Sequence, residues 1–170
     1  MKRILLFLLL ALLPLAASAG KPAARTASKS KLAAVVSEFR GYDGVEVVKL
    51  GWLGTAAVKS VVRMAAKSDP DARQALDLVR GVKRFTVLEY DGCTPEVRER
   101  ITRRLDQALH GSELLMEAKD GSERVRMFGV VDDASGEVRD FVLHAPSDHA
   151  LICIFGSIPM ESVAKVLSDD

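Results

Sequence analysis

The stretch that decides the fold is residues 82–111, VKRFTVLEYDGCTPEVRERITRRLDQALHG. Its first part, 82–90, is rich in β-branched and aromatic residues and ends at Asp91-Gly92, which is typical of a strand followed by a turn. Thr94 and Pro95 then suit the N-cap and first position of a helix, and Gly111 suits its end. Apolar residues recur at helical spacing between them: Val97, Ile101, Leu105, Ala108 and Leu109. The stretch therefore predicts a strand that leads into a helix with one buried stripe.

The N-terminal residues 1–19 have the three parts of a secretory signal peptide. Lys2 and Arg3 are basic, residues 4–13 are uniformly apolar, and Ala17-Ser-Ala19 is a small-residue cleavage site. The apolar run is shorter than the roughly 20 residues that a membrane-spanning helix needs. We therefore expect cleavage near Ala19 and a periplasmic or secreted chain without a transmembrane segment.

The charge balance excludes a strong electrostatic attraction for polyanions. Removal of residues 1–19 takes away two of the 24 basic residues and none of the 23 acidic ones, which leaves a net charge of −1. Nucleic acid is therefore not expected as a partner, and bulk charge does not favour anionic membranes. The remaining length suits one domain.

Residues 20–30 are small, basic and proline-containing, which predicts a flexible segment before a single domain over 31–167. A first helix is expected next, with a glycine stop at Gly41. Its apolar stripe is Leu32, Val35, Val36 and Phe39. We interpret the stripe as one that covers a sheet, although such a helix can also dock on a membrane or a partner.

Residues 45–50 predict a short strand that follows the turn Asp43-Gly44. Two helices are expected before the strand at 82–90, one after Gly54 and one from Pro70 to Gly81. The first is expected to direct these residues inward: Leu53, Val58, Val61, Val62 and Ala65. Such a connection suggests a crossover, right-handed if the two strands are parallel neighbours. The repeat of Tyr-Asp-Gly at 42–44 and 90–92 is interpreted as turn chemistry that recurs by chance.

From Ser112 the pattern changes to strands with short turns. Strands are expected at 114–118, 124–131, 138–143 and 150–155, the last of them central because both its faces are apolar. A short C-terminal helix is expected from Pro159, with Val163, Val166 and Leu167 inward. The fold class predicted is α+β, a mixed, mainly antiparallel sheet of about six strands with helices packed on one face.

Two segments carry a resemblance to a known family. Residues 114–121, LLMEAKDG, and residues 152–166, ICIFGSIPMESVAKV, resemble the domain-of-unknown-function family 4252 of exported bacterial proteins. The resemblance covers roughly Lys31 to Leu167. It implies an exported α+β domain and supplies no catalytic residue. The Ala/Arg-rich composition and the two cysteines depart from the common pattern of the family.

Cys93 and Cys153 are the candidates for thiol chemistry. Cys93 precedes a helix, where the N-terminal dipole can lower a thiol pKa and produce a reactive thiolate. In an oxidising compartment, a structural disulfide between the two cysteines or burial of both is the favoured interpretation. The redox state of Cys93 therefore separates an enzyme from a binding module.

His144 and His149 flank Asp148 and form a weak candidate metal site. Their spacing matches no standard site, so solvated loop histidines are the favoured interpretation. Trp52 lies between two glycines and is a candidate for binding as an exposed contact residue, although a core or lid role is the favoured interpretation.

The sequence contains no Gly-x-Ser-x-Gly and no glycine-rich phosphate loop, and nothing in it calls for a cofactor. Two classes of function remain. The first is a non-catalytic envelope module that binds a protein or a small ligand. The second is a thiol-dependent enzyme or redox protein that uses Cys93.

Overall fold

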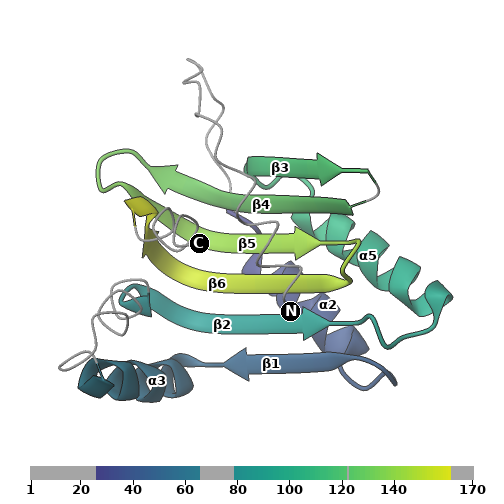
Figure 1. Cartoon of the computed structure of the whole chain (residues 1–170), viewed down its shortest axis with the longest axis horizontal. Coiled ribbons are helices and arrows are strands. Elements are labelled where there is room, and N and C mark those ends of the chain that lie inside the picture. Colours follow the sequence, from purple (N-terminus) through teal and green to yellow (C-terminus); the bar gives the residue numbers. More distant parts are fainter. Residues whose placement is uncertain (1–25, 66–78, 122, 162–170) are drawn as a thin grey trace.

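The computed structural model describes residues 26–65, 79–121 and 123–161. Six strands form one sheet in the order β1-β2-β6-β5-β4-β3, and every neighbouring pair is antiparallel (Figure 1). The α+β class, the six strands and the central place of the last strand are confirmed. The strands are β1 (Glu46–Leu50), β2 (Val82–Glu89), β3 (Leu114–Asp120), β4 (Glu123–Asp132), β5 (Glu137–Ala145) and β6 (Ala150–Pro159).

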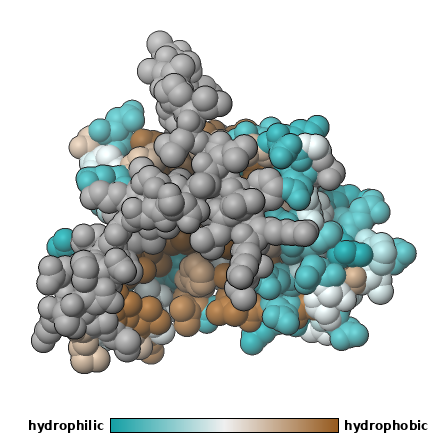
Figure 2. Space-filling view, viewed as in Figure 1, coloured by the Kyte–Doolittle hydropathy of each residue, from teal (hydrophilic) through white to brown (hydrophobic). Residues whose placement is uncertain are grey.

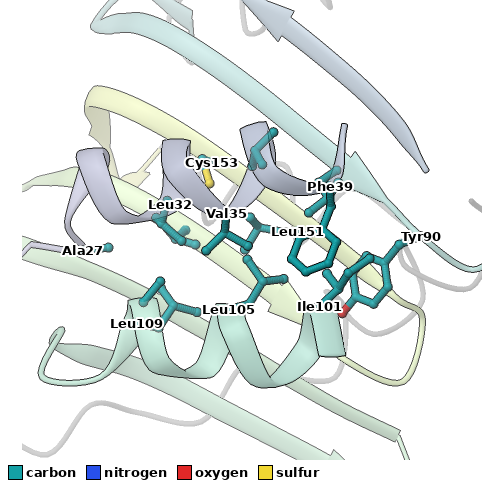
Figure 3. Packing of buried hydrophobic residues seen from close by; sticks show 14 of the residues in the cluster. Ala27, Leu32, Val35, Phe39, Tyr90, Ile101, Leu105, Leu109, Leu151 and Cys153 are labelled. Atoms are coloured by element: carbon teal, nitrogen blue, oxygen red, sulfur yellow. The ribbon is translucent and has the colours of Figure 1, made fainter. Parts of the chain in front are cut away.

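Two helices, α2 (Lys29–Phe39) and α5 (Pro95–Leu109), cover one face of the sheet (Figure 1). Their predicted apolar stripes face each other and the sheet, as the labelled side chains in Figure 3 show. Val97 is half-buried at the edge of this contact. The fully buried members include Leu32, Val36, Phe39, Ile101 and Leu105. The 3.6-residue repeat thus predicted the helix layer correctly, because an apolar stripe on a helix is buried by packing against another apolar surface.

The domain begins earlier than residue 31. Ala27 is buried in the core, and Ser28 caps α2 by accepting a hydrogen bond from the backbone N–H of Lys31 at 3.4 Å. The expectation of a flexible segment is therefore wrong for residues 27–30, since a capped helix and a buried methyl group fix them. The residues before Thr26, with the predicted signal peptide, lie outside the described part of the chain.

β1 and β2 are antiparallel neighbours, with Leu50 opposite Phe85 and Glu46 opposite Glu89. The parallel crossover is thereby excluded, because the connection leaves and re-enters the sheet at the same end. Its first helix is α3 (Trp52–Ala65), and most of the second predicted helix lies outside the described residues.

The orientation predicted for α3 is wrong for two residues. Leu53 is 65 % exposed and Val58 is 41 % exposed. Thr55 is buried instead, and the Nζ of Lys59 donates hydrogen bonds to the carbonyls of Arg80 at 2.8 Å and Val82 at 2.6 Å. A charge-assisted contact attaches the helix to the start of β2, so the larger apolar side chains are free to face outward.

β6 runs to Pro159, four residues beyond the predicted end, and sequence periodicity missed the extension because Gly156 interrupts it. Gly156 has φ of +129°, and a Cβ there would lie 2.2 Å from the carbonyl oxygen of Gly81. The predicted C-terminal helix lies outside the described residues beyond Glu161. No helix of the described part is long and apolar enough to cross a membrane.

Candidate functional site

A cavity of about 200 Å³ lies between the N-terminal half of α2 and the ends of β1 and β2. It exists because α2 and α5 pack against each other over the sheet and leave the far ends of β1 and β2 partly uncovered (Figure 1). The lining is mainly apolar. It includes Leu32 and Val36 from α2, Leu50 from β1, Phe85 from β2, and Cys153 and Phe155 from β6.

Three basic side chains also line this cavity: Lys29, Lys49 and Arg84. Lys29 is already engaged, since its Nζ lies 3.0 Å from Oδ1 of Asp140 and 5.5 Å from the ring centre of Phe155. Lys49 and Arg84 form no ion pair with another described residue. No acidic residue is among the described residues that line the cavity. Among the described residues, the cavity thus combines an apolar interior with two cations, Lys49 and Arg84, that have no acidic partner.

Strand register brings Lys49 and Arg84 together. Lys49 is the direct partner of Thr86 across the β1–β2 pair, and Arg84 lies two residues before Thr86 on β2. Diagonal neighbours of this kind are about 7–8 Å apart, within reach of long side chains. One anionic group can therefore contact both cations.

Cys153 lies at the floor of the cavity, beneath α2 (Figure 3). It is 1 % exposed, and burial raises the pKa of its thiol to about 12. Such a thiol stays protonated and behaves as a small apolar group.

Cys93 lies in the turn between β2 and α5. It is buried, and its Sγ donates a hydrogen bond to the carbonyl oxygen of Asp43 at 3.3 Å. Burial raises the pKa of its thiol, and the nearby Arg98 opposes this effect only in part. The lowered pKa expected at a helix start is therefore not found, because desolvation of the thiolate outweighs the local positive charge.

The two cysteines are free thiols in the structure and do not form the candidate disulfide. Cys153 pairs with Thr86 and Val142 in the middle of the sheet, whereas Cys93 lies beyond the end of β2. A disulfide requires Cα atoms within about 7 Å of each other.

His144 is fully buried in β5 and is not a solvated loop residue as predicted. Its cross-strand partner is Arg126, whose Nη2 lies 3.0 Å from Nδ1 of His144 and forms an ion pair with Asp106 of α5. Because a guanidinium can only donate, Nδ1 accepts and the ring proton is on Nε2. Burial, with a further contribution from Arg126, lowers the pKa of His144 to about 4. The imidazole is neutral near pH 7 and serves as an acceptor for Arg126.

A second polar pair, Tyr90 and Thr102, lies at the inner side of α5. The hydroxyls of Tyr90 and Thr102 are 3.0 Å apart, and burial raises the pKa of Tyr90 to about 12. The ring of His149 packs edge-on against Tyr90, with 5.5 Å between the ring centres. Desolvation lowers the pKa of His149. These contacts make Tyr90 and His149 part of the packing at the end of β2.

The candidate metal set of His144, Asp148 and His149 is not brought together. His144 faces Arg126 and Asp106, while His149 faces Tyr90. Within the described part of the chain, no group of three or more His, Cys, Asp or Glu side chains is placed to hold a metal ion. His144 and His149 are close in the sequence, but they lie apart because β5 ends at Ala145 and His149 belongs to the turn before β6.

Trp52 is 68 % exposed at the first position of α3. The expectation of a core residue is therefore wrong, and a binding role for this exposed side chain stays a prediction. Trp52 lies outside the cavity lining.

A comparison with family models matches residues 43–166 to the domain of unknown function DUF4252. The chain belongs to this family. The match spans all six strands of the sheet together with α3 and α5, and it confirms the resemblance found in the sequence. No curated protein and no solved structure matches the chain.

Sequence reasoning missed the most concentrated groups of polar residues in this DUF4252 domain. Asp106, Arg126 and His144 are up to 38 positions apart, and Lys49 and Arg84 are 35 apart. The only available signal for the first group was an arginine on a strand face that also carries Phe128. In the structure Phe128 is buried and Arg126 is mostly covered.

Proposed function

We propose that this DUF4252 protein is an exported envelope protein that acts as a non-catalytic binding module. Its ligand is a small amphipathic anion, held in the cavity beside α2. The observation that carries the proposal is the pairing of an apolar interior with Lys49 and Arg84, two cations without an acidic partner among the described residues.

Each part of such a ligand has a counterpart in the cavity. A short aliphatic chain or a single ring would contact Leu32, Val36 and Phe155. A carboxylate or phosphate would accept hydrogen bonds from the guanidinium of Arg84 and the ammonium of Lys49. Ligand sites of this kind combine mainly apolar walls with a few polar groups that orient the ligand.

The environments of the reactive groups support a non-catalytic role. A thiol enzyme needs a thiolate near neutral pH, and burial raises the pKa of Cys93. A general base needs a free acceptor, and Nδ1 of His144 is occupied by Arg126. Neither group lines the cavity.

The ligand is tested by calorimetric titration of the exported chain with straight-chain carboxylates of increasing length and with the corresponding alcohols. We expect the acids to bind and the alcohols to bind at least about tenfold more weakly, because only the acids pair with Arg84 and Lys49. Arg84→Gln and Lys49→Gln should each weaken acid binding by about tenfold. Lys31→Gln is the matched control, since it removes the same charge from an exposed position on α2 outside the lining. Equal binding of acids and alcohols, or equal losses in all three variants, would contradict the proposal.

Export is tested separately by N-terminal sequencing of the protein from the envelope fraction of its native host. The basic start, the apolar run and the Ala17-Ser-Ala19 site support a chain that begins at Gly20. Retention of Met1 would contradict export without affecting the ligand proposal.

A further inference from the structure

The outward face of α3 is an exposed apolar surface. Trp52, Leu53 and Met64 are 68 %, 65 % and 63 % exposed. At 100° per residue they fall within one third of a turn. Figure 2 shows brown, hydrophobic residues at the lower left and along the lower edge, where Figure 1 places α3 and β1. The other residues on this arc are Ala56, Ser60 and Arg63.

This exposure follows from the way α3 is attached. The side of the helix that faces the start of β2 carries Thr55, Lys59 and Val62, which are buried or half-buried. Lys59 binds the carbonyls of Arg80 and Val82, so a polar contact anchors the helix. The helix places its small and polar residues against the sheet and its large apolar residues toward the exterior, which is typical of an interaction surface.

The surroundings of this face are positively charged. Described residues 47–65 and 79–88 contain six basic residues and no acidic one. Lys59 is bound to carbonyls, and the other five are exposed: Lys49, Arg63, Arg80, Lys83 and Arg84. Over the whole segment 47–88, eight basic residues face three acidic ones, whereas 89–170 contains nine basic and seventeen acidic residues. The near-zero net charge of the chain conceals this separation.

We propose that α3 docks in the plane of an anionic phospholipid membrane surface. Trp52, Leu53 and Met64 enter the boundary between headgroups and acyl chains, and Arg63 with Arg80 and Lys83 contacts the anionic headgroups. Interfacial helices use this combination of an aromatic residue, aliphatic residues and basic neighbours. The proposal is independent of the ligand cavity, because all of these residues are exposed and none of them lines the cavity.

Charge complementarity favours a membrane over a second copy of the chain. A twofold dimer through α3 would place one basic surface against an identical basic surface, which is unfavourable. An anionic bilayer supplies both the apolar layer and the opposite charge.

The experiment uses the fluorescence of Trp52, the only tryptophan in the chain, as a local probe. The exported protein is titrated with vesicles of equal parts phosphatidylglycerol and phosphatidylcholine, and with pure phosphatidylcholine vesicles. We expect a blue shift and quenching by brominated acyl chains with the anionic vesicles, and strong weakening of binding in high salt. Leu53→Gln combined with Met64→Gln should lower the vesicle affinity at least about tenfold. Arg63→Gln and Lys83→Gln should each lower it about fivefold.

Leu114→Gln is the matched control. Leu114 is an exposed apolar residue too, at 48 %, but it lies on β3 at the opposite edge of the sheet. It should leave vesicle binding unchanged, and circular dichroism melts verify that every variant is folded. The proposal is overturned if Trp52 emission does not respond to anionic vesicles, or if both vesicle types bind equally. It is also overturned if the α3 variants bind like Leu114→Gln, or if Trp52 emission shifts with protein concentration alone, which would indicate self-association.

Discussion

Gly44 and Gly92 pack backbone against backbone. A Cβ at Gly44 would lie 2.3 Å from the carbonyl carbon of Gly92, a distance at which one segment must move. Each glycine follows a Tyr-Asp pair, and the two turns hold the start of β1 and the start of α5 together. The hydrogen bond from Cys93 to the carbonyl of Asp43 reinforces this contact. The repeated Tyr-Asp-Gly therefore has a packing role that the chance interpretation did not assign.

Gly44→Ala should lower the free energy of unfolding by roughly 3 kcal/mol or more. Alanine at this position would combine an unfavourable positive φ with a steric collision between its Cβ and the backbone of Gly92. Urea denaturation measures the effect. Gly136→Ala is the control, since Gly136 also has positive φ but has open space around it, and about 1 kcal/mol is expected there. Equal losses in the two variants would contradict the importance of the glycine contact.

His144 should make the protein less stable as the pH falls from about 6.5 to about 4. Its folded pKa is about 4, below the ordinary value of 6.5, so the unfolded state binds the proton first in this window. The contribution lost is on the order of 3 kcal/mol. Above pH 6.5 the residue is neutral in both states and adds no pH dependence.

The measurement is urea denaturation of wild type and His144→Gln across this pH range. The variant should lose less stability than wild type as the pH falls, because Gln can still accept from Arg126 without titrating. Any contribution of His149 to the pH dependence is the same in both proteins and cancels in the comparison. His110→Gln, at an exposed position, should behave like wild type. Parallel curves for wild type and His144→Gln would refute the assignment.

Lys59→Met should lower the free energy of unfolding by about 1–2 kcal/mol, because the carbonyls of Arg80 and Val82 lose a charged donor. Chemical denaturation with Lys31→Met as control is the check, since Lys31 is exposed on α2. If both variants unfold at the same denaturant concentration as wild type, Lys59 does not anchor α3.

Both thiols should be free and slow to react in the folded protein. Burial raises the pKa of Cys93 and of Cys153, so iodoacetamide near neutral pH should modify them at least about a hundredfold more slowly than glutathione. In guanidinium chloride both should react, as mass spectrometry will show. Rapid native alkylation of Cys93 would revive the thiol-enzyme alternative, and a mass deficit of two hydrogens would indicate a disulfide.

The sequence by itself determined the class of the fold and most of its elements. Strand and helix periods are local properties, so the stripe of Leu32, Val35, Val36 and Phe39 identified the buried face of α2 before any partner was known. The strands with short turns expected after Ser112 likewise predicted the pairing of β3 with β4.

Only the tertiary structure decided which distant side chains meet. The antiparallel pairing of β1 with β2 placed Lys49 beside Arg84, and α5 brought Asp106 to Arg126 and His144. The outward orientation of α3 was also decided there, because Lys59 found carbonyl acceptors at the start of β2. Such contacts depend on register and docking between segments that are distant in the chain. Local periodicity carries no information about them.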